Sequence, residues 1–322
     1  MTDDRYPIEL TAPDISPYRA GNTGIDYVTT FDSGAPGPHV MVNAVTHGNE
    51  ICGAIALDFL FRHEVRPTRG WLTLSFANAE AYLRFDPALA TATRFVDEDF
   101  NRLWTAEILE GPRDSVELRR ARELRPTFDG VDFLLDIHSM QHTTTPLSMA
   151  GPLAKGRALA AAVGFPSRVV MDAGHAAGRR LRDYAGFADP ASAKCAALIE
   201  CGQHWEASSA EVAIEAALRF LRHFDMIDPE LAADNVSDEP LPPQTVIEVT
   251  QAVTIKTEAF AFVREFGGLE VIPAAGTVLA HDGDEAIATP HDDCVLVMTS
   301  RRFKPGRTAV RLGRYVTPGA RG

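Results

Sequence analysis

The sequence predicts an α/β domain built on a sheet with parallel strands, followed by a smaller all-β domain. A strand, a helix and a second strand follow one another within residues 39–78, and such a unit requires a parallel sheet. Two later apolar segments, 131–137 and 196–201, are typical of buried strands. Beyond residue 244, short strands alternate with glycines and no convincing helix is found, which indicates a small all-β domain.

The elements of the first domain follow from apolar periodicity and its breaks. Residues 39–45 form a β-branched, apolar run that predicts a strand. Apolar residues at helical spacing predict a helix from about Glu50 to His63, which Pro67 and Gly70 end. Further strands are predicted at 25–31, 71–78, 131–137, 147–150, 168–171 and 196–201, and further helices at 114–124, 154–163 and 208–224. Residues 79–112 lack strong periodicity and predict a long functional loop with short helical pieces.

An acidic, proline-rich segment separates the two predicted domains. We therefore expect a first domain at 1–225, a linker at 226–244 and a small β domain at 245–322. The strands of the small domain are predicted at 245–255, 260–264, 277–280, 294–299 and 309–315.

Composition narrows the class of partner. Lysine and arginine number 31 and aspartate and glutamate 44, and the net charge of −13 disfavours nucleic acid because it repels phosphate backbones. The apolar runs are far shorter than the ~20 residues that span a bilayer. The acidic start, Met1–Arg5, is unlike a signal peptide, so no membrane association and a cytoplasmic location are expected. The four cysteines show no C-x-x-C spacing and are expected to be buried thiols.

Polar residues lie at the ends of three predicted strands, where open α/β sheets bind ligands. His47 and Glu50 lie where the strand at 39–45 turns into a helix, so both side chains can point at one metal ion. His138 follows a second strand, two residues after Asp136, whose carboxylate could hold the imidazole in one tautomer. Two histidines and a glutamate are a common ligand set for catalytic zinc. Taken alone, the His-x-x-Glu pair favours a capped helix start with a hydrogen-bonded histidine.

Glu200 ends a third strand that is otherwise apolar. It could accept backbone hydrogen bonds at the rim of the sheet, or it could act as a general base whose pKa is raised by apolar neighbours. The loop 94–104 holds Arg94, Asn101 and Arg102 among aromatic residues. Taken alone, it favours a solvated, salt-bridged loop. The same side chains could clamp a carboxylate, because arginine offers a bidentate fork and asparagine one more donor.

The chain contains four short motifs in this order: His47-Gly48-Asn49-Glu50, Asp99-Phe100-Asn101-Arg102, Asp136-Ile137-His138 and Ile199-Glu200. Together they resemble the succinylglutamate desuccinylase/aspartoacylase family, which belongs to the zinc carboxypeptidase superfamily. The resemblance of motifs covers roughly residues 40–205. It implies a zinc-carboxypeptidase-like mixed sheet flanked by helices. It also implies one Zn²⁺ per chain, bound by His47, Glu50 and His138.

The resemblance also implies roles for the remaining residues of the motifs. Glu200 matches the glutamate that activates water and passes its proton to the leaving amine. Asn101 and Arg102 match the pair that holds the substrate carboxylate, and Arg94 matches the arginine that helps polarise the scissile carbonyl. The small β domain matches the carboxy-terminal domain that narrows the cleft in this family.

The chain departs from the family pattern in two places. Aspartoacylases carry a further substrate-binding arginine shortly before the catalytic glutamate, but the corresponding segment here, 189–191, contains none. The nearest candidates are Arg179, Arg180 and Arg182, of which we predict Arg180 to bind substrate. The family's substrate-contacting tyrosine in the carboxy-terminal domain has no clear counterpart, although Phe303 falls near the expected place. N-acetylaspartate itself is therefore not the expected substrate.

The function predicted from the sequence is a zinc-dependent amidohydrolase that removes an acyl group from an N-acylated amino acid or a similar small carboxylate. Two alternatives are a zinc carboxypeptidase acting on a peptide or cell-wall fragment, and a metal-binding regulatory protein without catalysis. Four further histidines could line the cleft: His142, His175, His204 and His291. Exposed strand edges of the small β domain could pair between subunits, which leaves a homo-oligomer open.

Overall fold

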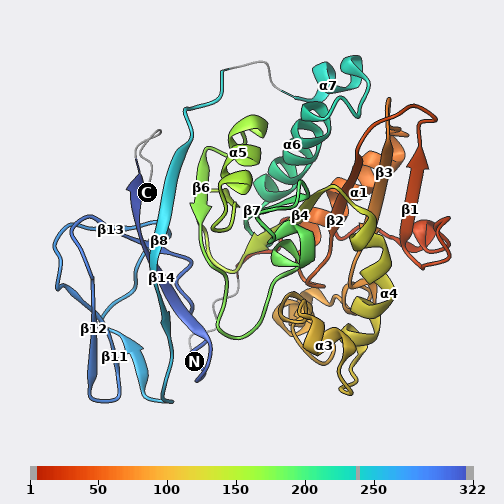
Figure 1. Cartoon of the computed structure of the whole chain (residues 1–322). Coiled ribbons are helices and arrows are strands. Elements are labelled where there is room, and N and C mark those ends of the chain that lie inside the picture. The colour runs from red at the N-terminus through yellow and green to blue at the C-terminus, as the bar shows by residue number, and fades with distance from the viewer. Residues whose placement is uncertain (1–5, 237–239, 317–322) are drawn as a thin grey trace.

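A large mixed sheet forms the centre of the molecule (Figure 1). The computed structural model describes residues 6–236 and 240–316. Its strands are β1 Val28–Asp32, β2 His39–Ala44, β3 Trp71–Phe76, β4 Phe133–Met140, β5 Leu147–Met149, β6 Arg168–Met171, β7 Cys195–Gln203, β8 Thr245–Thr254, β9 Phe260–Phe262, β10 Val271–Ile272, β11 Val278–Asp282, β12 Glu285–Ala288, β13 Cys294–Val297 and β14 Thr308–Val316. Within the described residues, one 11-stranded sheet has the order β1-β3-β2-β4-β7-β5-β6-β8-β14-β13-β10, and β12-β11-β9 form a separate antiparallel sheet.

Helices cover both faces of the amino-terminal part of the large sheet. They are α1 Ile51–Arg62, α2 Ala79–Tyr82, α3 Ala106–Glu110, α4 Val116–Gly130, α5 Ala154–Val163, α6 Ala207–His223 and α7 Pro229–Asn235. Apolar side chains of α1, α5, α6 and α7 pack with one face of the sheet, and those of α3 and α4 pack with the other. Figure 1 shows α3 and α4 apart from α6 and α7 in the same way. The mixed sheet flanked by helices confirms the predicted fold class.

The strand–helix–strand unit predicted from the sequence is β2-α1-β3. β2 pairs in parallel with both β3 and β4, and β4 pairs in parallel with β7. The carboxyl ends of β2, β4 and β7 therefore meet at one edge of the sheet. That edge is where parallel α/β sheets place ligands.

Two helices differ from the sequence prediction. α4 continues through Pro126 to Gly130, beyond the predicted end at residue 124, because Leu124 and Phe128 are both buried on its inner side. α7 forms inside the predicted linker. The Asp228 side chain caps it by accepting a hydrogen bond from a backbone N–H, and Pro229 occupies the first turn, where a missing N–H leaves no helical bond unmade. Residues 237–239 of the predicted linker lie outside the described residues.

The carboxy-terminal part of the chain contains no helix in the described range 245–316, as predicted. The short strands β10 and β12 were not anticipated. β8 pairs in parallel with β6, so β8, β14, β13 and β10 extend the large sheet. Figure 1 shows β8, β14 and β13 continuing from β6 at one end of the sheet. The predicted domain boundaries remain a prediction.

A buried glutamate on α4 holds the loop that precedes the Asn101–Arg102 motif. The Glu117 side chain is fully buried and accepts hydrogen bonds from the backbone N–H groups of Val96, Asp97 and Glu98, at 2.6, 3.0 and 3.2 Å. Its carboxylate also accepts a hydrogen bond from the Asn78 side chain at 3.1 Å. Four donors on one carboxylate fix the path of the loop between Arg94 and Asn101.

We expect the substitution Glu117→Ala to destabilise the fold by about 3 kcal/mol, because it leaves three backbone N–H groups and the buried Asn78 amide without their acceptor. Urea unfolding measures this change. The matched control is Glu107→Ala on the exposed side of α3, which should change the unfolding free energy by less than about 0.5 kcal/mol. Equal urea midpoints for Glu117→Ala and the wild-type protein would show that the loop does not depend on this carboxylate.

Two further predictions can be compared with the structure. All four cysteines, Cys52, Cys195, Cys201 and Cys294, are free and buried, as expected. None of the helices within residues 6–236 and 240–316 combines the length and the apolar character needed to cross a membrane.

Candidate active site

The structure brings together the polar ends of three neighbouring strands. His138 on β4 lies directly across from Glu200 on β7 in the parallel register. His47 and Glu50 follow the end of β2, the other neighbour of β4. All four side chains line one cavity. The convergence predicted from the strand ends is therefore present.

A constrained turn places His47 and Glu50. Val45 has a φ of 61°, a left-handed conformation that is unusual for a β-branched residue and costs about 1–3 kcal/mol. The Gly48 backbone N–H donates to the Arg94 carbonyl at 3.0 Å, which ties this turn to the loop 94–104, called the arginine loop below. A Cβ atom at Gly48 would lie only 2.5 Å from the Thr93 carbonyl oxygen, so no other residue fits without displacing the backbone.

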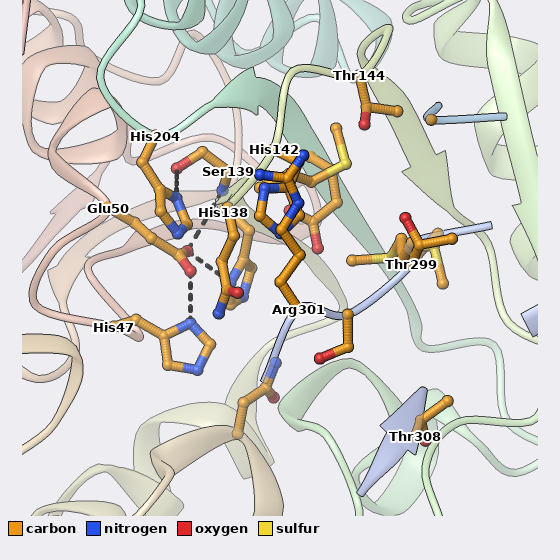
Figure 2. Close-up of a pocket in the computed structure, with 18 of the residues that line it drawn as sticks. His47, Glu50, His138, Ser139, His142, Thr144, His204, Thr299, Arg301 and Thr308 are labelled. Atoms are coloured by element: carbon orange, nitrogen blue, oxygen red, sulfur yellow. Dashed lines mark hydrogen bonds and ion pairs between the residues drawn. The ribbon is translucent and has the colours of Figure 1, made fainter. Parts of the chain in front are cut away.

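His47, Glu50 and His138 form a compact, buried cluster of metal-ligand atoms. His47 Nδ1 lies 2.7 Å from one Glu50 carboxylate oxygen, and His138 Nδ1 lies 2.9 Å from the other. One ligand atom from each residue lies within 4.8 Å of the other two. Figure 2 shows the three side chains pointing toward one another. Each is at most 2% exposed, so a bound cation would be shielded from solvent on this side.

The outer nitrogens of both histidines contact carboxylates. His138 Nε2 lies 2.8 Å from Asp136, which is itself held by the Asn43 and Thr46 side chains at 2.8 and 3.0 Å. His47 Nε2 lies 2.9 Å from Asp99. A carboxylate on the outer nitrogen leaves Nδ1 free to bind a metal ion and makes it more basic. Two imidazoles and one carboxylate, oriented in this way, fit Zn²⁺.

Glu200 lies beside this cluster with an unused oxygen. Its side chain is 7% exposed, and among the described residues no partner donates a hydrogen bond to Oε2. Burial raises the pKa of the Glu200 carboxyl to about 8, and the imidazole of His138 offsets this only in part. A carboxyl with such a pKa can both accept and release a proton near neutral pH.

The arginine loop contacts both the cluster and the cavity. Arg94 Nη1 donates to Glu50 at 3.0 Å, and Arg94 Nη2 lies 2.9 Å from His47 Nε2. Asn101 Oδ1 accepts a hydrogen bond from the Leu181 backbone N–H at 2.8 Å, which leaves the Asn101 amide nitrogen as the group able to donate to a ligand. Arg102 also lines the cavity and is partly exposed toward it.

Arg180 lines the same cavity, but each of its three guanidinium nitrogens already donates a hydrogen bond to a carboxylate. Arg180 Nε donates to Asp183 at 2.7 Å, while Nη1 and Nη2 donate to the two oxygens of Asp172 at 3.1 and 2.8 Å. Burial alone would raise the pKa of Asp172, but the neighbouring guanidinium groups of Arg180 and Arg311 hold it at about 2. The substrate contact of Arg180 stays a prediction.

The cavity has a volume of about 570 Å³, which suits a small molecule. Its second wall comes from the carboxy-terminal part of the chain, through residues 266–268 and 298–301 and through Arg307, Thr308 and Arg311. Figure 2 shows Thr299 and Thr308 on this wall, across from His47 and Glu50. The carboxy-terminal part of the chain therefore narrows the site, as the family resemblance implies.

Sequence reasoning missed several residues of the cavity. Three arginines of the carboxy-terminal part line it: Arg301, Arg307 and Arg311. Arg311 is noticeable in the sequence as a charged residue within the apolar strand 309–312, but its place in the cavity depends on how that strand pairs in the sheet. The candidates His142, His175 and His204 also line the cavity, whereas His291 does not and instead contacts Thr250 at 3.0 Å.

His204 and Ser139 form a buried pair next to Glu50. His204 Nδ1 lies 2.8 Å from Ser139 Oγ, and the Ser139 backbone N–H donates to Glu50 at 3.3 Å. His204 Nε2 has no hydrogen-bond partner among the described residues. Burial lowers the pKa of His204 to about 3, so this imidazole is neutral.

Comparison with known sequences identifies a family. The sequence profile of the succinylglutamate desuccinylase/aspartoacylase catalytic domain matches residues 36–224. An N-acyl-aromatic-L-amino acid amidohydrolase (carboxylate-forming) of Rattus norvegicus is 33% identical over 114 residues, which cover 33% of this chain and 34% of the rat protein. The chain thus spans about a third of the length of that relative. A succinylglutamate desuccinylase of Paraburkholderia xenovorans (strain LB400) is 26% identical over 297 residues, covering 84% of this chain and 79% of that protein.

Comparison with solved structures supports the fold. A succinylglutamate desuccinylase from Vibrio cholerae superposes with a TM-score of 0.69 at 16% sequence identity. The superposition covers 90% of this chain and 85% of that one. At this identity the likeness concerns the fold alone.

Proposed function

Because the chain belongs to the succinylglutamate desuccinylase/aspartoacylase family, we propose that it is a zinc-dependent amidohydrolase that removes the acyl group from an N-acylated amino acid or a similar small carboxylate. One observation carries the proposal. A buried His-Glu-His cluster, an unpaired glutamate and an arginine loop line a single cavity of small-molecule size.

His47, Glu50 and His138 would hold one zinc ion per chain. Their ligand atoms already converge, and Asp99 and Asp136 orient the two imidazoles from behind. A bound zinc ion would supply a Lewis acid that polarises the amide carbonyl and lowers the pKa of water to about 7.

Glu200 would move the proton. Its unpaired Oε2 takes a proton from the attacking water and later donates it to the departing amine nitrogen. Burial raises the pKa of Glu200, so in the absence of a cation the carboxyl is protonated at neutral pH. A positive charge in the neighbouring cluster favours the carboxylate, which is the form that accepts the proton.

The arginine loop would orient the substrate and stabilise the charge that develops on it. Arg94 lies against Glu50 and His47, so its guanidinium can donate to the carbonyl oxygen as negative charge builds there. Arg102 and the amide nitrogen of Asn101 would bind the substrate carboxylate and hold the scissile amide beside Glu200.

The size of the cavity, about 570 Å³, and its second wall favour a small substrate over a long peptide. Residues of the carboxy-terminal part form its second wall and limit the room for an extended chain. The related proteins are named for acylated amino acids: N-acyl-aromatic-L-amino acids in one case and succinylglutamate in another. Both names agree with an acylated amino acid as substrate. A cytoplasmic location and a homo-oligomer stay predictions from the sequence.

The proposal is tested with zinc-loaded protein and a panel of N-acyl amino acids that varies the acyl chain and the amino acid together, assayed beside short peptides. We expect release of free amine from at least one N-acyl amino acid, and much slower cleavage of peptides. Preferential cleavage of peptides would support the carboxypeptidase alternative. Complete inactivity on the panel, with zinc bound, would support the regulatory alternative.

A further inference from the structure

Arg311 places a guanidinium from the carboxy-terminal part of the chain into the wall of the cavity. It lies on β14, between the buried residues Val310 and Leu312, and is only 2% exposed. Burying an arginine within an apolar strand costs free energy unless its guanidinium is paired with an anion or with hydrogen-bond acceptors. Arg311 nevertheless lines the same cavity as Glu200 and Arg102.

Two neighbours fix the orientation of Arg311 and leave one end of its guanidinium available. Arg311 Nε donates to Asp172 at 3.1 Å, and Nη2 lies 2.6 Å from His175 Nε2. Burial and the nearby arginines lower the pKa of His175 well below its usual range, so the ring is neutral and can accept this hydrogen bond. Within the described residues, no group accepts a hydrogen bond from Arg311 Nη1.

Arg180 provides the contrast, because Asp172 and Asp183 occupy all of its nitrogens. Asp172 also forms an ion pair with Arg311, so its single negative charge is shared between two guanidinium groups. Arg180 thus positions Asp172, and Asp172 positions Arg311.

Arg102 lies near Arg311 in the lining of the cavity. Gly178 lies three residues after His175 in the same loop. A Cβ atom on Gly178 would lie 2.4 Å from the Arg102 carbonyl oxygen. The loop containing His175 therefore packs directly on the Arg102 backbone. Among the described residues, the Arg102 guanidinium donates only to the Asn101 carbonyl, through Nη1 at 2.6 Å, so its Nε and Nη2 are available to a ligand.

The guanidinium groups of Arg102, Arg180 and Arg311 lie close to one another in the lining of the cavity. Burial lowers the pKa of Arg102 to about 10, and the neighbouring cations Arg94, Arg180 and Arg311 contribute, although Asp99 opposes them. Burial likewise lowers the pKa of Arg311; Arg180 adds to this lowering, while the Asp172 and Glu200 carboxylates oppose it. Mutual repulsion between buried guanidinium groups is relieved when an anion binds between them.

We infer that Arg311 is the second carboxylate-binding arginine of the site, and that the substrate carboxylate binds between Arg102 of the loop 94–104 and Arg311 of β14. The inference rests on the proposed function for the identity of the ligand. It gives the carboxy-terminal strand a direct part in substrate selection. It also accounts for the lack of an arginine at 189–191, because the second cation comes from another part of the chain.

The test measures binding rather than turnover. Calorimetry on the zinc-loaded Glu200→Gln protein compares N-acetyl-L-phenylalanine with its carboxamide, which lacks the negative charge. Adding Arg311→Gln should weaken binding of the acid by about 10- to 100-fold, the value of a lost charged hydrogen bond, and leave binding of the carboxamide within about 2-fold. The matched control is Arg314→Gln, an exposed position on the same strand that pairs with Glu248, and it should change neither.

Arg311→Lys provides a second variant that keeps the positive charge beside Asp172 if Arg311→Gln does not fold. We expect it to weaken binding of the acid alone, by about 5- to 10-fold, because a lysine lacks the guanidinium fork. Equal weakening of acid and carboxamide, unchanged binding of both, or no binding of the acid to the Glu200→Gln protein would each overturn the inference. Failure of the proposed function would appear instead as absence of amine release by the wild-type protein, independently of how the Arg311 substitutions affect binding.

Discussion

Replacing Glu200 with glutamine should lower the turnover of N-acyl amino acids by about 10²- to 10⁴-fold while zinc remains bound, because a positioned acid–base group contributes a factor of this size. The amide has the shape of the carboxylate but cannot take a proton from water. Glu200 makes no hydrogen bond to His47, Glu50 or His138, so the change leaves the metal ligands in place. Steady-state kinetics and zinc content, measured on the same preparation, check both parts of the expectation.

A matched control separates catalysis from charge. Glu211 lies on the exposed side of α6, away from the cavity lining, and Glu211→Gln removes the same charge there. Its kcat should stay within about 2-fold of wild type, as is usual for surface substitutions. Wild-type turnover in the Glu200→Gln protein would rule out the proposed proton transfer.

The second large effect concerns the metal. His138→Ala should reduce the zinc content from one ion per chain to near zero and abolish turnover, because three protein ligands are the minimum of a catalytic zinc site. Asp136→Asn keeps all three ligands but weakens the support of His138, so zinc affinity should fall by about 10- to 100-fold. Elemental analysis and competition with a chelator measure these two changes.

The control for the metal variants is His281→Ala, because His281 is exposed on β11 and outside the cavity lining. It should keep one zinc ion per chain. Full zinc occupancy in the His138→Ala protein would show that the metal, if bound, is held elsewhere.

His47, Glu50, His138 and Glu200 could be predicted because each lies at or just after the end of a recognisable strand. The apolar runs before His138 and Glu200 predict two buried strands, and parallel pairing brings their carboxyl ends to one edge. The turn after β2 adds His47 and Glu50 by local geometry. Local sequence patterns are sufficient to predict these four residues, because ligands of parallel α/β sheets bind at the carboxyl ends of the strands.

Other features depend on long-range pairing that local sequence does not encode. Nothing in the segment 309–315 states that β14 would lie beside β8 and extend the main sheet, so Arg311 could not be assigned to the cavity. The network of Asp172, Arg180 and Arg311 joins β6, a loop and β14 across 139 residues of chain. The helix α7 was missed because its acidic and proline-rich composition is also typical of a linker.

The central claim is that the His47–Glu50–His138 cluster and Glu200 form one zinc-dependent hydrolytic centre. The most direct measurement is a titration of metal-free wild-type protein with zinc, following release of amine from an N-acyl amino acid. We expect activity to rise from near zero and to level off at one zinc ion per chain. Full activity without metal, or saturation with zinc without any amine release, would contradict the account.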